Sequence, residues 1–259
     1  MGKLNSPLNY PMFLMYSICA LSSIDDSLSR WQQICHWAQQ NDRCQQYQKD
    51  DVVYCESEWM YFVQRGVVRL HGQQIINNSL LRLPKQSIAK CAAIDSKKES
   101  TTLSLLALVR NGQPFEFGRE QHVKIQAIAH TRNTKVFRIN ATELSLVPGF
   151  EMDTLQAFRY QHQRQMLRLN NLTQGRTIDQ LLGYLYLLGE EFGEEDNAGL
   201  HLPFALTHSQ LAEAIGSSRV TITRMLGELR KYGEISISGG NKISLPRRKN
   251  PTLHLHLIE

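Results

Sequence analysis

The chain has 259 residues, of which 42% are hydrophobic and 20% are charged, and its formal net charge is +5. This length allows two domains with a hydrophobic core in each, and this composition excludes a disordered chain. No apolar run reaches the roughly 18 residues that span a bilayer, and the five cysteines include no CxxC pair, which argues against a disulfide framework or a structural zinc site.

The N-terminal 50 residues mix apolar and polar segments. Residues 11–21 are apolar but short, only Lys3 precedes them, and no small-residue cleavage site follows, so we expect a buried strand or helix here and not a signal peptide. Residues 29–48 favour a helix, because apolar side chains such as Trp31 and Ile34 recur every three or four positions. Because the sequence predicts neither a membrane span nor a signal peptide, we expect the protein in the cytoplasm, or in the plastid stroma if its gene is plastid-encoded.

A β-strand pattern begins at Asp51. Short apolar runs alternate with turn residues and predict strands over 52–54, 59–63, 67–70, 103–109, 123–129 and 136–139. Turns are predicted at 65–66, 111–112 and 131–134. Residues 71–100 are polar and include the charged run 95–100, so we expect an insertion or a long loop there.

The period of the pattern changes after residue 150. Between residues 151 and 172, apolar side chains recur every three or four positions, which predicts a long amphipathic helix. The members of this seam are Met152, Leu155, Phe158, Gln161 or His162, Met166, Leu169 and Leu172. The seam continues over 178–188, whereas residues 190–199 are acidic, contain glycine and are expected to form a loop. Such a helix indicates a dimer interface, and the alternative is an ordinary core helix.

The segment 206–245 begins with the pattern of a short helix and a tight turn. Thr207 is suited to cap the helix N-terminus, because its hydroxyl can accept from a main-chain N–H of the first turn. Leu211, Ala212 and Ile215 would then share one face. Gly216 follows directly, where a sharp turn costs glycine little.

A second helix and a small sheet are predicted next. Residues 217–218 offer a second N-cap, and the buried stripe of the helix would be Ile222, Met225, Leu226 and Leu229. A small residue, a glycine and an apolar anchor at these offsets are typical of a helix-turn-helix. The alternating residues 235–238, the turn 239–241 and the run 242–245 predict a two-stranded wing.

The outer face of the second predicted helix carries side chains suited to base edges. Arginine can donate two hydrogen bonds to guanine, and the methyls of valine and threonine can contact the thymine methyl. The predicted base contacts are Arg219, Val220, Thr223 and Arg224. Polar groups at helix starts and a lysine on the wing suit phosphates. The predicted phosphate contacts are Thr207, His208, Ser209, Ser218 and Lys242. The alternative is that the two arginines are merely solvated helix charges.

Positive charge concentrates in this segment. Residues 206–249 contain eight lysines and arginines against three acidic residues, an excess equal to the net charge of the whole chain. A basic end on a near-neutral body is typical of a module that binds nucleic-acid phosphates.

Residues 206–245 resemble the winged helix-turn-helix of the Crp/Fnr family of transcription regulators. The stretch AEAIGSSRVTITRMLGELR, residues 212–230, is very similar to the cyanobacterial global nitrogen regulators of that family. The resemblance implies an α+β fold: a β-roll like that of cyclic-nucleotide-binding domains over 1–149 with an insertion near 71–100, a dimerisation helix over 150–175, and a winged helix-turn-helix over 176–259. It also implies a homodimer that binds an inverted repeat of GTA-type half-sites in double-stranded DNA, with RNA polymerase as a further partner.

The residues of the family's sensor sites match less well. Cyclic-nucleotide-binding relatives use Gly-Glu and Arg-Ser pairs, whereas the stretch 111–126 holds Gly112, Glu116, Gly118 and Arg119 in a different order. Where the nitrogen regulators hold 2-oxoglutarate with an arginine and a glutamate, this chain has Gln161 and Met166. His71 and His122 are available to a haem, but an isolated histidine is more often structural.

The four N-terminal cysteines are spread over Cys19, Cys35, Cys44 and Cys55, unlike the clustered ligands of an iron–sulfur sensor. We therefore expect no cofactor and no metal, and a constitutive or partner-regulated factor.

Two alternatives remain from the sequence. One is a sensor of this family that responds to a ligand, to haem or to redox state, and the other is a winged helix that binds protein and has lost DNA contact. Enzymatic motifs such as GxGxxG, GxxxxGK[ST], HExxH and GxSxG are absent from the sequence, so we expect no catalytic residues. His254 and His256 alternate as in a strand and are a weak metal pattern.

Overall fold

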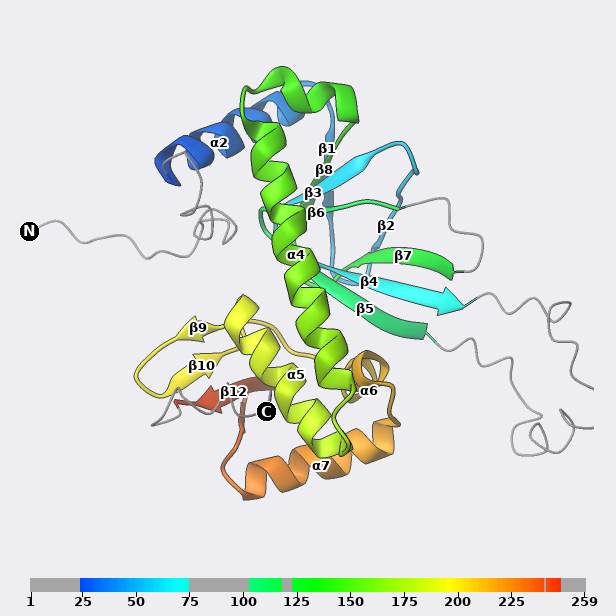
Figure 1. Cartoon of the computed structure of the whole chain (residues 1–259), viewed down its shortest axis with the longest axis vertical. Coiled ribbons are helices and arrows are strands. Elements are labelled where there is room, and N and C mark those ends of the chain that lie inside the picture. The colour runs from blue at the N-terminus through cyan, green and yellow to red at the C-terminus, as the bar shows by residue number, and fades with distance from the viewer. Residues whose placement is uncertain (1–23, 75–102, 118–122, 240, 248–259) are drawn as a thin grey trace, which may run out of the picture.

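The structure, a computed structural model, describes residues 24–74, 103–117, 123–239 and 241–247. Figure 1 shows β-sheets and helix α2 (Ile24–Gln40) in the upper half, the long helix α4 (Phe150–Leu172) running down the molecule, and a helical domain at the lower end. The apolar segment 11–21, residues 75–100 of the expected insertion and the tail 254–256 lie outside the described residues.

Two antiparallel four-stranded sheets form the N-terminal part. The first sheet has the order β1-β8-β3-β6, with β1 Cys44–Tyr47, β8 Thr134–Ile139, β3 Met60–Arg65 and β6 Pro114–Phe115. The second has the order β2-β7-β4-β5, with β2 Val52–Val53, β7 Val123–Ala129, β4 Val67–Gln74 and β5 Leu103–Arg110. Apolar side chains from both sheets, among them Val63, Val68 and Val136, share one buried cluster. The N-terminal part is therefore a two-sheet β-roll.

The structure contains elements that the sequence pattern did not predict. The helix expected over 29–48 begins at Ile24 and ends at Gln40, and the polar residues that follow form β1, which pairs with β8. β4 continues to Gln74 because its polar end pairs with both β5 and β7. A 3₁₀ helix, η2 (Ala141–Leu146), precedes α4 and is closed by a capping box between Asn140 and Glu143.

An ion pair fixes α4 to α2. The Arg30 guanidinium donates Nε to Asp153 Oδ2 at 2.7 Å and Nη2 to Oδ1 at 2.9 Å. Ser27 donates to the same carboxylate. Beside this pair, Trp31 packs on the rings of Phe62, Phe137 and Phe150. A two-point pair is stronger than a single contact, so α2 is an integral part of the roll.

The C-terminal part contains helices α5 (Thr177–Phe192), α6 (His208–Ile215) and α7 (Arg219–Lys231). Its sheet has the order β11-β12-β10-β9, with β11 Ser236–Ser238, β12 Lys242–Pro246, β10 Gly199–His201 and β9 Glu194–Glu195. The prediction of a loop over the whole of 190–199 is wrong. α5 runs to Phe192, and the acidic residues after it form the hairpin β9–β10, which extends the wing to four strands.

The roll packs directly on the C-terminal part. Val67, Leu105 and Leu108 of the roll belong to the same hydrophobic cluster as the buried faces of α5, α6 and α7. Around this seam lie His71 of β4, whose Nδ1 is 3.4 Å from Glu213 Oε2 of α6, and His130, whose ring meets Phe204 edge-on at 4.9 Å. Burial lowers the pKa of both histidines, which favours their neutral forms.

We predict that His130 makes the stability of the fold depend on pH. Burial, followed by the charges of Arg69 and Lys49, lowers the pKa of His130 to about 4 from 6.5, while Asp50 opposes this shift. Unfolding then takes up a proton below pH 6.5, so the stabilisation is complete above that pH and is lost as the pH falls towards 4. Between pH 7.5 and pH 5, wild type should lose about 2 kcal/mol more unfolding free energy than His130→Leu. Urea titrations of both proteins at the two pH values measure this difference, and identical losses would contradict it.

Candidate DNA-binding site

The first helix of the site, α6, is closed at its N-terminus by its own sequence. Thr207 Oγ1 accepts from the Gln210 main-chain N–H at 3.1 Å, and Gln210 Oε1 accepts from the Thr207 N–H at 2.9 Å. This reciprocal pair is a capping box. The predicted cap at Thr207 is confirmed, and the partner Gln210 was missed. Leu211, Ala212 and Ile215 are buried, as predicted.

The turn between the helices depends on a glycine. Gly216 ends α6 with φ of +66°, in the left-handed region. A β-carbon there would meet open space, so the requirement for glycine is conformational and not steric. Ser218 then caps α7, and its Oγ accepts from the Thr221 N–H at 3.1 Å. The turn thus sets the direction in which α7 leaves.

The inner face of α7 docks it on the domain. Ile222, Leu226 and Leu229 are buried in the cluster that includes Leu211 and Ile215, and Met225 is partly buried against it. All of the predicted stripe residues therefore face inward. This leaves the opposite side of α7 to solvent.

The outer face carries the predicted base contacts. Arg219, Val220, Thr223 and Arg224 are all exposed, and the Val220 side chain is 80% exposed although it is apolar. Arg224 Nε lies 3.9 Å from Glu228 Oε1, in a loose pair with both side chains in solvent. Such an exposed pair is worth little energy and is easily exchanged for another partner. Neither arginine points into the protein.

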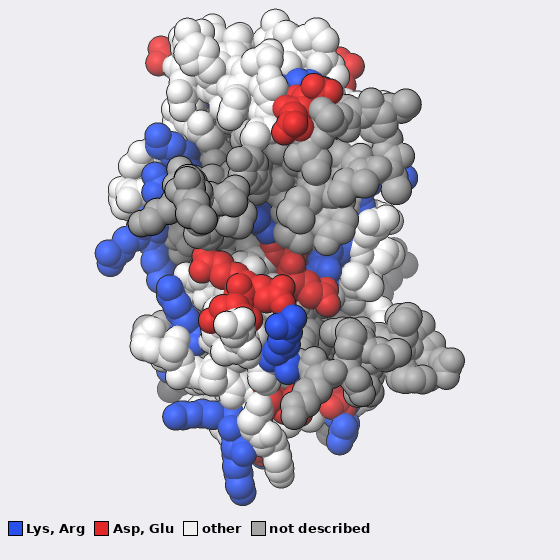
Figure 2. Space-filling view, turned by 90° about the vertical axis from the view of Figure 1, so that its left-hand side faces the viewer, with Lys and Arg blue, Asp and Glu red and all other residues white. Residues whose placement is uncertain are grey.

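The predicted phosphate contacts have mixed surroundings. His208 Nδ1 lies 2.8 Å from Thr223 Oγ1, and Thr223 Oγ1 donates to the Arg219 carbonyl at 2.9 Å. The Thr207 and Ser218 hydroxyls already serve as caps, whereas Ser209 and Lys242 are exposed. Lys242 begins β12, where it faces Ser238 of β11. Lysine and arginine side chains project from the lower end of the molecule in Figure 2, and acidic ones gather across the middle of that face.

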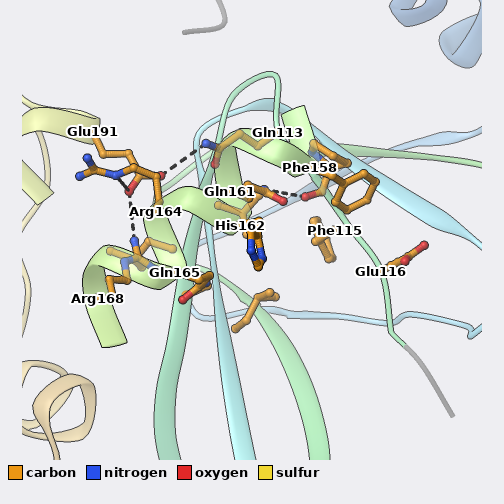
Figure 3. A pocket seen from close by; sticks show the side chains of 15 residues that line it. Gln113, Phe115, Glu116, Phe158, Gln161, His162, Arg164, Gln165, Arg168 and Glu191 are labelled. Carbon is orange, nitrogen blue, oxygen red and sulfur yellow. Dashed lines mark hydrogen bonds and ion pairs between the residues drawn. The ribbon is translucent and has the colours of Figure 1, made fainter. Parts of the chain in front are cut away.

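A second feature is a cavity of about 290 Å³ between the roll and α4, which Figure 3 shows. Its apolar walls include Val109, Phe115 and Phe158. Of the residues at the positions compared with the family's sensor sites, Glu116 and Gln161 line it, and Gln161 donates to the Pro114 carbonyl at 2.8 Å.

The other residues compared with the family's sensor sites lie elsewhere. Met166 is exposed, and Gly112 forms the turn before β6 with φ of +83°. His71 faces Glu213 at the domain seam. Gly118, Arg119 and His122 lie outside the described residues.

The polar end of this cavity was not foreseen from the sequence. Arg164 and Arg168 of α4 meet the Glu191 carboxylate from the last turn of α5, and Gln113 of the roll contacts it from the other side. These partners lie in separate segments of the chain, so no local pattern signals the cluster.

Known proteins match the C-terminal part of the chain. Residues 179–250 match the family model of the Crp-like helix-turn-helix domain. The chain carries a Crp-like helix-turn-helix domain. Within the Crp-like domain the chain is 41% identical over 69 residues to the global nitrogen regulator of Synechocystis sp.. The aligned region covers 27% of each chain. It is 38% identical over 68 residues to the anaerobic regulatory protein of Bacillus subtilis, covering 26% of this chain and 29% of that one. The chain therefore aligns with about a quarter of the length of these curated relatives.

Solved structures match over most of the chain. A CRP/FNR-family transcriptional regulator from Thermus thermophilus aligns with a TM-score of 0.55 and 24% identity, over 79% of this chain and 93% of that one. A cyclic nucleotide-binding domain containing protein from Listeria monocytogenes aligns with a TM-score of 0.61 and 13% identity, over 83% and 97%. These matches confirm the predicted α+β fold, with a β-roll, a long helix and a C-terminal winged helix-turn-helix.

We predict that neighbouring residues on the two faces of α7 differ sharply in their effect on stability. Ile222 is 0% exposed, so Ile222→Ala should lower the free energy of unfolding by about 2–5 kcal/mol. Val220→Ala should change it by less than about 0.5 kcal/mol, because the side chain is in solvent. Urea unfolding followed by circular dichroism measures both values. Equal losses would show that α7 does not dock as described.

Proposed function

We propose that this protein is a sequence-specific DNA-binding transcription regulator that acts as a homodimer on an inverted repeat of GTA-type half-sites. The observation that carries the proposal is α7: its inner face is buried by Ile222, Leu226 and Leu229, while its outer face presents two arginines to solvent. The Crp-like domain match supports the DNA partner. The half-site is taken from the similarity to the nitrogen regulators.

The geometry of the outer face supports particular base contacts. The recognition helix of a helix-turn-helix enters the major groove with its N-terminal residues towards the bases, and Arg219 and Val220 are the first two residues of α7. The Thr223 hydroxyl is engaged by His208 and by the Arg219 carbonyl, so its methyl is the group left for a base. Arginine on guanine and methyl groups on thymine fit the G and T of the proposed half-site.

We predict that Arg219→Ala weakens binding to a GTA inverted repeat by about 1–3 kcal/mol and relaxes the choice of base at one position. Arg230→Ala is the matched control, because it removes the same charge from the exposed far end of the same helix. Its loss should be smaller and equal on cognate and scrambled DNA. Fluorescence anisotropy with both duplexes measures these affinities. Equal binding by Arg219→Ala and wild type would refute the proposed contact.

A salt titration separates DNA binding from a protein-interaction module. Each neutralised phosphate releases counterions, so the affinity of wild type for DNA should fall steeply as salt rises. A winged helix that has lost DNA contact would show no cognate binding at any salt concentration.

The exposed side of α4 supports the homodimer. Met152 and Leu155 near the start of the helix, and Met166, Leu169 and Leu172 near its end, lie three residues apart within each group and are all at least 40% exposed. The opposite side of the helix is buried in the same chain through Thr154, Ala157 and Tyr160. An apolar stripe of this kind on a helix that already has a buried face fits a second copy of the same helix.

We predict that Leu155→Glu converts the dimer to a monomer, because it places a charge in the apolar interface without touching the buried face of α4. Gln32→Glu, which adds the same charge at an exposed polar position of α2, outside the apolar stripe of α4, is the control and should remain dimeric. Sedimentation velocity at micromolar concentration gives the two masses. A dimeric Leu155→Glu protein would place the interface elsewhere.

A ligand-responsive sensor is the second candidate, and the 290 Å³ cavity beside α4 favours it. An absorption spectrum of the purified protein tests the haem and iron–sulfur forms of this candidate.

The proposed location is the cytoplasm, or the plastid stroma if the gene is plastid-encoded, and RNA polymerase is a proposed partner. Among the described residues, no helix combines the length and apolar character that a membrane span requires.

A further inference from the structure

The last turn of α5 carries a carboxylate that is hidden from solvent. Glu191 is 3% exposed, in a helix whose own last turn contains no basic residue. A buried carboxylate is costly unless it is paired and hydrogen-bonded. Its partners must therefore come from other elements of the chain.

Three separate elements supply those partners. Arg168 Nη2 of α4 lies 3.1 Å from Glu191 Oε2, and Arg164 Nε lies 3.6 Å from the same oxygen. Gln113 Nε2, from the turn between β5 and β6, donates to Oε1 at 3.4 Å. Arg110 at the end of β5 donates to the main-chain oxygen of Glu191. One residue of the Crp-like domain thus contacts both the roll and the long helix (Figure 3).

The arginines also cap the helix. Arg164 donates Nη2 to the Leu187 carbonyl and pairs through Nη1 with Glu190 Oε2 at 3.1 Å. Cations at a helix C-terminus satisfy its free carbonyls and its negative dipole end. Burial lowers the pKa of Arg164, but the carboxylates of Glu191 and Glu190 raise it by more, so the guanidinium stays charged.

We infer that Glu191 is a built-in carboxylate ligand, which occupies the arginine pair at the polar end of the cavity and holds the Crp-like domain on the roll without a diffusible effector. The inference extends the proposed function, because it assigns the regulation of the DNA-binding module to the chain itself. Removal of the carboxylate opens a site for a small free monocarboxylate, with the same two guanidinium groups and the Gln113 amide as its donors.

The test is chemical rescue of Glu191→Ala by acetate, with sodium chloride at equal ionic strength as the reference salt. Breaking a buried pair should lower the melting temperature of Glu191→Ala by about 5–10 °C. Acetate should raise it again as its concentration increases, because a ligand that binds only the folded state stabilises that state. Glu194→Ala is the control, because it removes an exposed carboxylate on β9. Wild type and this variant should each show the same melting temperature in the two salts. A melting temperature unchanged by Glu191→Ala, or a loss that acetate does not reverse, would overturn the inference.

Glu191→Gln covers the case in which the alanine variant fails to fold, because it keeps the shape of the side chain while it removes the charge and one acceptor oxygen. Limited proteolysis should cleave it faster than wild type in the link between α4 and α5, residues 173–176, and equal rates would overturn the inference. These readouts need no DNA, so they stand apart from the proposed function. In a separate assay, acetate should restore binding of Glu191→Ala to the GTA repeat; absence of DNA binding by wild type as well would refute the proposed function and leave the rescue result intact.

Discussion

The burial of one face of α5 is the interaction on which the rest of the molecule depends. Leu181, Leu185 and Leu188 are fully buried, in a cluster that reaches the roll, the two helices of the DNA-binding module and the wing. Removing apolar surface from water is the main favourable contribution to folding. Because α5 lies at the centre of this cluster, it fixes α6 and α7 relative to the sheets, and the direction of the recognition helix follows from it.

The sequence was most informative where structure is determined locally. Thr207, Gly216 and Ser218 act within one turn of chain, so the helix-turn-helix and the inward stripe of α7 could be read from spacing alone. β1 could not, because its sequence CQQY has no apolar alternation and becomes a strand only by pairing with β8. The hairpin β9–β10 was hidden in an acidic run for the same reason. Strands of this kind depend on tertiary contacts and not on intrinsic preference.

The exposed residues on the outer face of α7 were also predictable from the sequence, whereas the polar cluster around Glu191 was not. An exposed arginine on a helix is visible in a helical projection. Glu191 is separated from Arg168 by 23 residues, from Gln113 by 78 and from Arg110 by 81. Only the folded chain brings these groups together, and a single sequence carries no signal for contacts at such separations. The same holds for the Arg30–Asp153 pair, which joins α2 to α4 across 123 residues.

The continuity of one hydrophobic cluster through both halves of the chain limits how this protein can evolve. Val67, Leu105 and Leu108 pack in one cluster with the buried side chains of α5, α6 and α7. Exchange of the C-terminal part for that of a distant relative would leave mismatched apolar surfaces on either side of the junction. Under the proposed function, a new operator preference would be acquired by point substitution at Arg219, Val220, Thr223 and Arg224, because these exposed side chains lie outside that cluster.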